Sequence, residues 1–175
     1  MADIEINKPI VLVGIMGCGK SHVGKALARD FGLPFYDSDS LIEKQQGKPI
    51  TQIFADDGQA YFRELEKEVI SDLLDSGFCI IATGGGSVTA PETLDMIKDA
   101  SISIWLNPDV ETIWERVKGD NSRPLLNCDN PRAKLEELLS ARASLYAQSD
   151  IEVDNSAGAD AVIAEIKGAL ILNAN

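Results

Sequence analysis

Short apolar runs alternate with longer amphipathic segments along the chain. The runs are rich in β-branched residues and are bounded by glycine, proline or polar residues, as is typical of buried strands. They occupy residues 10–13, 34–36, 78–83, 102–106 and 151–153. Because strands that alternate with helices form parallel sheets, this order predicts a three-layer α/β/α fold around a five-stranded parallel sheet.

Helical spacing of apolar residues is clearest in residues 21–31, 59–74, 131–149 and 159–172. Asn130 can cap the third of these helices, and Pro131 suits its first turn. Just before it, residues 118–130 lose this periodicity and concentrate glycine, asparagine, aspartate and proline. This stretch is either a mobile loop that closes over a ligand or an ordinary surface connection.

The chain of 175 residues has a formal net charge of -12, from 16 Lys and Arg against 28 Asp and Glu. Its field repels nucleic-acid backbones and anionic membranes, so we expect neither as a partner. The length predicts one domain over residues 1–175. Three cysteines without paired spacing, and no apolar signal in residues 1–8, predict a cytoplasmic protein. We expect a monomer whose basic residues gather where anionic substrates bind.

Residues 14–21 read GIMGCGKS and fit the phosphate-loop pattern G-x-x-x-x-G-K-[ST] between a predicted strand and a predicted helix. The residue frequencies of this chain give on the order of 0.006 accidental matches to that pattern. Lys20 is placed to reach the β- and γ-phosphates of a nucleotide, and the Ser21 hydroxyl to ligate Mg²⁺. The sequence therefore predicts a P-loop NTPase fold that uses ATP and Mg²⁺ for phosphoryl transfer.

Gly14, Gly17 and Gly19 let the backbone of this loop turn its amide groups toward phosphate oxygens. Between them, Cys18 is expected to contribute its amide, with the thiol as a spectator. His22 is the only histidine, and we expect only its backbone to take part. Both residues enter the predicted ATP site through their backbone, as Gly17 and Gly19 do.

Two carboxylates, Asp37 and Asp39, follow the second predicted strand. The carboxyl ends of parallel strands form the edge where open α/β sheets bind ligands. Residues two apart in an extended chain point to the same side, so both side chains are expected to face the cleft, one toward Mg²⁺ and one toward an acceptor hydroxyl. Capping of a helix ahead of Leu41 is the alternative, and the two roles can coexist.

Glycines 84–86 follow the third predicted strand. Three glycines leave this part of the sheet edge without side chains, so that a ligand can approach the backbone closely. A flexible turn is the alternative, but a turn needs only one glycine. We therefore favour a ligand-binding interpretation of the triplet.

Arg142 lies on the apolar stripe of the helix predicted over residues 131–149. A charge on a buried face requires a partner, which is either a structural Asp or Glu or an anionic ligand held by the guanidinium fork. Arg63 lies at the margin of the apolar stripe of the helix at 59–74. It can turn to the cleft or pair with Glu66 on the surface.

Arg116 and Arg123 lie at the start of the aperiodic stretch and inside it. A cation on a loop can reach the transferring phosphoryl group when the loop closes. A solvated loop charge is the alternative for both, more so for Arg116, because Pro124 stiffens the setting of Arg123. We expect a lid over about residues 116–130.

These motifs resemble the shikimate kinase family along almost the full length of the chain. The ordered set comprises GIMGCGKS at 14–21, DSD followed by IE at 37–43, IF at 53–54, YFRELE at 61–66, GGG at 84–86, RPLL at 123–126 and RASLY at 142–146. The resemblance implies a five-stranded P-loop fold with a lid. It also implies transfer of the ATP γ-phosphoryl group to the 3-hydroxyl of shikimate, a step of aromatic amino-acid biosynthesis.

The resemblance implies roles for single residues on the substrate side. Asp39 matches the acid that binds the shikimate hydroxyls and accepts a proton. Arg63 and Arg142 match the pair that holds the substrate carboxylate, and Gly85, together with Gly86, matches a backbone contact.

On the nucleotide side, the resemblance makes Asp37 an acid near Mg²⁺ that acts through water. Arg123 matches the lid arginine, and Arg116 matches a residue that lies against adenine. The segment that contacts adenine, near residues 155–159, is less recognisable.

Two alternatives remain beside this interpretation. A gluconate-kinase-like sugar-acid kinase shares the phosphate loop and architecture, but it is not expected to show Arg63, the triple glycine and Arg142 in this order. A catalytically inactive nucleotide-binding regulatory protein is the alternative of a different class. The retention of Lys20 and Asp39 argues against it.

Overall fold

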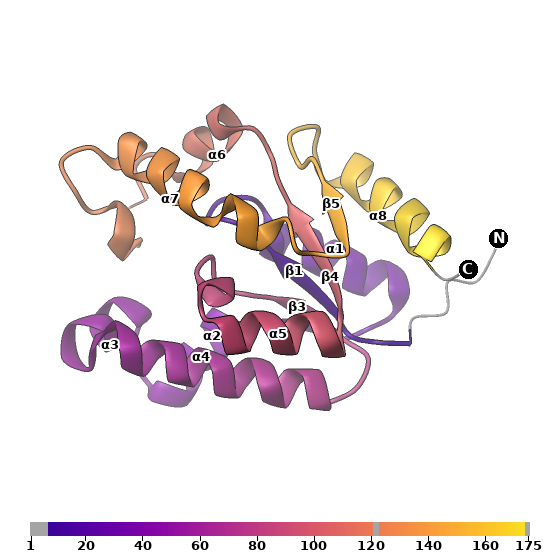
Figure 1. Cartoon of the computed structure of the whole chain (residues 1–175), viewed down its shortest axis with the longest axis horizontal. Helices are drawn as coiled ribbons and strands as arrows, with labels where there is room; N and C mark the ends of the chain where they lie inside the picture. Colours follow the sequence, from indigo (N-terminus) through magenta and orange to yellow (C-terminus); the bar gives the residue numbers. More distant parts are fainter. Residues whose placement is uncertain (1–6, 121–122, 174–175) are drawn as a thin grey trace.

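The computed structural model describes residues 7–120 and 123–173. They form a parallel sheet of five strands in the order β2-β3-β1-β4-β5 (Figure 1). The strands are β1 Ile10–Val13, β2 Phe35–Asp37, β3 Ile80–Ala82, β4 Ile102–Leu106 and β5 Ile151–Val153. The predicted α/β fold with five parallel strands is confirmed.

Helices cover both faces of this sheet, with α1 behind it and α5 in front of it in the view of Figure 1. The helices are α1 Lys20–Phe31, α2 Ser38–Gln46, α3 Ile50–Asp56, α4 Gly58–Asp75, α5 Pro91–Ala100, α6 Val110–Val117, α7 Pro131–Tyr146 and α8 Ala159–Asn173. Short 3₁₀ turns lie at η1 Ser87–Thr89 and η2 Pro124–Leu126. In the described part of the chain, no helix has the length and apolar character needed to cross a bilayer.

The central strand explains why the core lies where it does. Every residue of β1 is at most 1% exposed, because strands flank it on both sides and helices cover both faces. Gly24 of α1 carries no side chain, and a Cβ there would lie 2.4 Å from the ring of Phe35. This close packing brings α1 down onto β1 and β2, so that its N-terminus points at the carboxyl edge of the sheet.

Several predicted boundaries differ from those of the structure, most of them by one residue. β2 extends to Asp37, which pairs in register with Ala82. β3 begins only at Ile80, because Phe78 is exposed in the turn that precedes it. The helix predicted to reach residue 149 ends at Tyr146, where the chain turns toward β5.

Candidate active site

A cavity of about 770 Å³ opens at the carboxyl ends of β1, β2 and β3. Its walls come from the phosphate loop, from helices α2 to α4 and from the triple glycine. Arg116, Arg123, Leu125 and Arg142 close it from the C-terminal half of the chain. Five Lys and Arg residues and four Asp and Glu residues line it, in a chain of net charge -12. The basic residues are therefore gathered at one site, as expected for anionic ligands.

The phosphate loop takes the conformation that its glycines allow. Gly14, Gly17 and Gly19 have φ values of 140°, 79° and 99°, which residues with side chains rarely adopt. The loop leads directly into α1, whose first residue is Lys20. The Lys20 ammonium donates to the carbonyls of Gly14 at 2.7 Å and Ile15 at 3.0 Å. A helix N-terminus and a buried ammonium thus face one wall of the cavity.

Cys18 does not line the cavity, whereas Gly17, Gly19 and His22 do. The Cys18 side chain is fully buried, and its backbone amide donates to the Ile15 carbonyl at 3.2 Å. The Cys18 amide is thus engaged within the loop, and its contact with a nucleotide stays a prediction. A spectator thiol agrees with the burial of the side chain.

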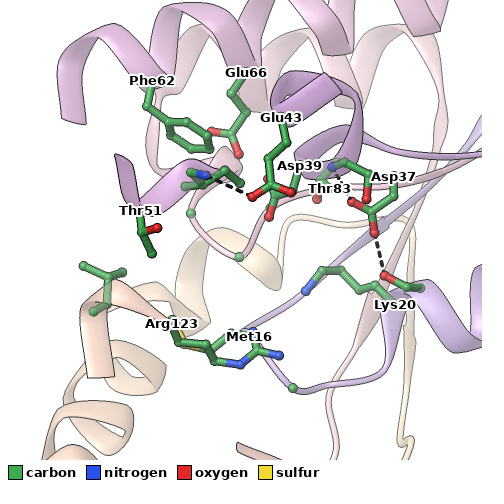
Figure 2. Close-up of a pocket in the computed structure, with 18 of the residues that line it drawn as sticks. Met16, Lys20, Asp37, Asp39, Glu43, Thr51, Phe62, Glu66, Thr83 and Arg123 are labelled. Atoms are coloured by element: carbon green, nitrogen blue, oxygen red, sulfur yellow. Dashed lines mark hydrogen bonds between the residues drawn. The ribbon is translucent and has the colours of Figure 1, made fainter. Parts of the chain in front are cut away.

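Ser21 and Asp37 meet across the edge of the sheet, with the Ser21 hydroxyl donating to Asp37 Oδ2 at 2.6 Å (Figure 2). Asp37 is also the N-cap of α2, because its Oδ1 accepts from the Ser40 amide at 3.1 Å. Capping and a position in the cavity therefore coexist. The predicted geometry was wrong in one respect, since Asp39 belongs to the first turn of α2 and not to an extended strand.

Figure 2 shows Asp39 with Asp37, Glu43 and Glu66 on one side of the cavity and Lys20 and Arg123 on the other. Asp39 Oδ1 is buried and has no hydrogen-bond partner among the described residues. Burial, and next to it the charge of Asp37, raises the pKa of Asp39 to about 6. A carboxylate with an unused buried oxygen is suited to accept a hydrogen bond from a hydroxyl-bearing ligand.

Arg63 and Glu66 form the predicted pair, but the pair lines the cavity and is not on the surface. Arg63 Nη1 lies 2.5 Å from Glu66 Oε2, and Glu66 is 1% exposed. Burial raises the pKa of Glu66 to about 7, and the charge of Arg63 opposes this rise. Glu66 Oε1 is buried without a hydrogen-bond partner among the described residues. The pair therefore holds Arg63 against the cavity wall.

Arg142 is buried, as its position on the apolar stripe of α7 predicted. Its Nη1 donates to the Gly85 carbonyl at 3.0 Å, and the guanidinium forms no ion pair with a carboxylate within residues 7–120 and 123–173. The Tyr146 hydroxyl, one turn further along α7, donates to the same carbonyl. The structural Asp or Glu is thus excluded as a direct partner in the described chain, and Arg142 lines the cavity.

The triple glycine is packed more tightly than a flexible turn requires. A Cβ on Gly84 would lie 2.4 Å from Glu66 Oε1, and one on Gly85 would lie 2.9 Å from the Met16 amide. A Cβ on Gly86 would overlap the Arg63 guanidinium. Each glycine therefore makes room for another part of the site, a reason that the sequence alone did not supply.

Arg116 lies in the last turn of α6 and contacts the phosphate loop. Its Nη1 contacts the carbonyls of Gly17 and Cys18 at 3.4 Å each, and its Nη2 donates to the Asn155 carbonyl at 3.0 Å. A purely solvated charge at Arg116 is thereby contradicted. Arg123 lines the cavity and forms an ion pair with Asp120, with Nε and Oδ2 2.9 Å apart. Asn121 and Ser122, in the middle of the predicted lid, lie outside the described residues.

The arrangement of these residues agrees with a comparison of the sequence with known families. A sequence model of the family described as shikimate kinase matches residues 16–170. The chain belongs to the shikimate kinase family. The predicted resemblance is confirmed, and the match includes the phosphate loop from Met16 on, the two acids, the triple glycine and Arg142.

Individual members of the shikimate kinase family are similar over most of their length. The shikimate kinase of Cereibacter sphaeroides is 44% identical over 154 residues, which cover 88% of this chain and 77% of that protein. The shikimate kinase of Persephonella marina is 45% identical over 144 residues, covering 82% and 87%. A solved shikimate kinase from Acinetobacter baumannii, in complex with shikimate, has a TM-score of 0.90 at 36% identity and covers 97% of this chain and 95% of that chain.

A gluconokinase from Sinorhizobium meliloti is also similar in structure, with a TM-score of 0.63 at 18% identity over 95% of this chain and 93% of that chain. At that identity the similarity extends to the fold alone. The gluconate-kinase alternative therefore gains no support beyond the shared architecture, which the sequence analysis had already allowed for.

Glu66 and Asn155 are two buried polar residues whose positions the sequence analysis did not foresee. Glu66 follows Phe62 by four residues and precedes Val69 by three, so it lies on the buried stripe of α4. The argument that singled out Arg142 on its stripe would have found Glu66 as well. Asn155 is 4% exposed in the turn after β5, and no periodicity signals its contact with the phosphate loop.

Proposed function

We propose that this shikimate kinase family member transfers the γ-phosphoryl group of ATP to the 3-hydroxyl of shikimate, giving shikimate 3-phosphate and ADP. One observation carries the proposal beyond the family assignment. Among the described residues, the buried guanidinium of Arg142 has no carboxylate partner and the buried Asp39 Oδ1 has no donor, and both residues line the same cavity as the phosphate loop. A small acid that also carries hydroxyl groups supplies both missing partners.

The nucleotide phosphates are proposed to lie along the phosphate loop. The amides of Gly17 and Gly19 and the N-terminus of α1 face that wall. Lys20 is buried beside it and exchanges its carbonyl partners for phosphate oxygens when ATP binds. Arg123 is proposed to approach the transferring group from the lid. Because Arg116 is tied to the phosphate loop, we place the moving part of the lid beyond it.

Ser21, near the start of α1, and Asp37, at the end of β2, fit Mg²⁺. Ser21 Oγ and Asp37 Oδ2 are two hard oxygen donors 2.6 Å apart on the cavity wall. The described residues contain no group of three or more His, Cys, Asp or Glu side chains suited to hold a metal ion. Such a sparse set suits an ion that keeps several waters and is held largely by phosphate oxygens, with Asp37 acting through water. When bound, Mg²⁺ neutralises charge on the phosphates.

Shikimate is proposed to bind at the opposite wall. Arg63 and Arg142 offer donors to its carboxylate, and Gly85 and Gly86 form the backbone floor between them. Asp39 orients the 3-hydroxyl and takes its proton as the oxygen attacks the γ-phosphorus in line with the leaving ADP oxygen. This site forms within a single domain over residues 1–175, which we propose to act as a cytoplasmic monomer without nucleic-acid or membrane partners.

The test of this function is a side-by-side assay of acceptors. Purified protein with ATP and Mg²⁺ is supplied with shikimate or gluconate, and ADP release is followed in a coupled assay. We expect shikimate-dependent ADP release to be about 10³-fold faster than the release with gluconate. Only shikimate is expected to place its carboxylate at Arg63 and Arg142 and a hydroxyl at Asp39 at the same time. A faster rate with gluconate would overturn the proposed acceptor. ATP binding without turnover of either acid would instead indicate the inactive regulatory protein.

The raised pKa of Asp39 predicts the pH dependence of the reaction. Protonated Asp39 cannot accept the hydroxyl proton, so kcat/KM for shikimate is expected to fall about tenfold per pH unit below the pKa of about 6. The measurement is a pH profile of kcat/KM. A flat profile down to about pH 5 would contradict a role for Asp39 as the base.

The raised pKa of Asp39 also predicts that its ionised carboxylate lowers the stability of the fold at neutral pH. Because the pKa of Asp39 is raised in the folded state, its contribution to the free energy of unfolding is present below the ordinary aspartate pKa of 3.8 and is lost as the pH rises through about 6. Asp39→Asn is therefore expected to raise the Tm at neutral pH by a few °C while it abolishes transfer. Asp30→Asn is the control, since Lys167 lowers the pKa of Asp30 and its removal should not stabilise the fold.

A further inference from the structure

The outer face of the phosphate loop is held by the side chain of Asn155. Asn155 Nδ2 donates to the Cys18 carbonyl at 2.6 Å, and Asn155, unlike Gly19, does not line the cavity. The described peptide bonds are all trans, so the N–H of a peptide unit points opposite to its carbonyl. A Cys18 carbonyl bound to Asn155 therefore turns the Gly19 N–H toward the cavity.

The Cys18 carbonyl is contacted by both Asn155 and Arg116. Arg116 Nη1 contacts the carbonyls of Gly17 and Cys18 at 3.4 Å, the longer contacts of the group. Arg116 Nη2 also donates to the Asn155 carbonyl at 3.0 Å, so the two side chains support each other. The short Asn155 bond is thus the principal restraint on the peptide between Cys18 and Gly19.

The fit between Asn155 and the loop is close. A Cβ on Gly19 would lie 2.4 Å from Asn155 Nδ2, so the position admits no side chain, in addition to its φ of 99°. Glycine at this position is thus required twice, once for its backbone angle and once for the approach of Asn155.

The turn that carries Asn155 is itself anchored. The Ser156 hydroxyl donates to Asp154 Oδ1 at 2.5 Å and accepts from the Asp109 amide at 3.0 Å, at the start of α6. Arg116, at the other end of α6, binds the Asn155 carbonyl. The asparagine is therefore presented to the phosphate loop by a segment tied to both ends of one helix.

We propose that Asn155 is a positioning residue for phosphate binding, which holds the Cys18–Gly19 peptide with its N–H toward the nucleotide. Without this donor, the Cys18 carbonyl is buried with a weaker partner, and the peptide can rotate so that a carbonyl oxygen faces the anionic phosphates. The inference rests on the proposed nucleotide site and adds a residue to it that does not touch the nucleotide phosphates.

The test compares ligands with and without phosphates in the Asn155→Ala variant. Calorimetric titration is expected to show about a tenfold loss of affinity for ADP, with adenosine within about twofold of the unchanged protein. The KM for shikimate should be unchanged. Equal losses for ADP and adenosine would overturn the proposal, because Asn155 would then act on the base or on the fold. An unchanged ADP affinity would overturn it as well.

A second variant covers the case in which Asn155→Ala loses its fold. Asn155→Asp keeps the shape of the side chain and replaces the donor by a carboxylate. Its deficit in ADP affinity, relative to the unchanged protein at each pH, should shrink as the pH falls from about 7 to about 4, because a protonated carboxyl can again donate to the Cys18 carbonyl. A deficit independent of pH would contradict the proposed hydrogen bond.

Asn107→Ala is the matched control for both variants. Asn107 follows β4 at the same edge of the sheet, and its Nδ2 donates to Glu152 and not to the phosphate loop. Its affinity for ADP should equal that of the unchanged protein. If the unchanged protein itself fails to bind ADP, the proposed function fails, and that outcome is distinct from a failure confined to the Asn155 variants.

Discussion

Lys20→Ala is expected to lower kcat for shikimate phosphorylation by about 10³-fold, the largest effect of any single change proposed. The Lys20 ammonium is buried at the start of α1, within 3.0 Å of two phosphate-loop carbonyls. In that setting its charge acts at low effective dielectric on the oxygens of the transferring phosphoryl group. The affinity for ADP should fall much less, since the amides of Gly17 and Gly19 remain. Single-turnover kinetics and ADP titration measure the two effects separately.

Lys25→Ala is the control for this prediction. Lys25 is an exposed lysine on the same helix, where its ammonium lies 5.9 Å from the centre of the Phe35 ring. Its kcat should stay within about twofold of the unchanged protein, because surface charges contribute little. Since Lys20 also binds the Gly14 and Ile15 carbonyls, the Tm of Lys20→Ala must be measured too. A kcat within tenfold of normal for a folded Lys20→Ala protein would contradict the assigned role.

Arg142→Ala is expected to raise the KM for shikimate by about 100-fold and to leave the KM for ATP within about twofold. The guanidinium is buried on α7, uses one donor on the Gly85 carbonyl and has no carboxylate partner among the described residues. A substrate carboxylate that completes the fork gains charge-assisted hydrogen bonds away from solvent. Steady-state kinetics with each substrate varied in turn give the two KM values.

A second variant at this position separates the charge of the guanidinium from its planar geometry, and a variant elsewhere on α7 serves as the control. Arg142→Lys keeps the charge but loses the planar fork, and its KM for shikimate should lie between those of Arg142→Ala and the unchanged protein. Arg132→Ala is the control on the same helix, because Arg132 is only half-buried and pairs with Glu111 and Glu136. Its kinetics should be unchanged. Unaltered shikimate kinetics in Arg142→Ala would remove the carboxylate assignment.

The basic side chains that line the cavity offset the negative charge of the protein at this one place. Outside the cavity, the field of a chain with net charge -12 repels anionic ligands, whereas Lys20, Arg63 and Arg142 attract them locally. Glu66 restrains Arg63 inside this cluster through a contact of 2.5 Å. A buried acid thus fixes the orientation of one of the basic groups that line the cavity.

The sequence by itself determined the class of fold and the presence of a phosphate site. The strands, the helix that follows the phosphate loop and the motif GIMGCGKS depend on residues close together in the chain, so spacing alone was sufficient. Spacing also placed Arg142 on a buried face, and the structure agrees. The extended-chain argument for Asp37 and Asp39 failed, because the Asp37 cap starts a helix at Ser38 and rotates Asp39 into its first turn.

Only the tertiary structure decided what those residues meet. The Gly85 carbonyl that Arg142 binds is 57 residues away from Arg142 in sequence. The side-chain amide of Asn155, which donates to the Cys18 carbonyl, is 137 residues away from Cys18. Burial of Glu66 and the unused oxygen of Asp39 likewise depend on the triple glycine, which packs between them. Local pattern specifies which face of an element is apolar. Which polar groups come together across the sheet edge depends on how all the elements pack, and no local spacing encodes that.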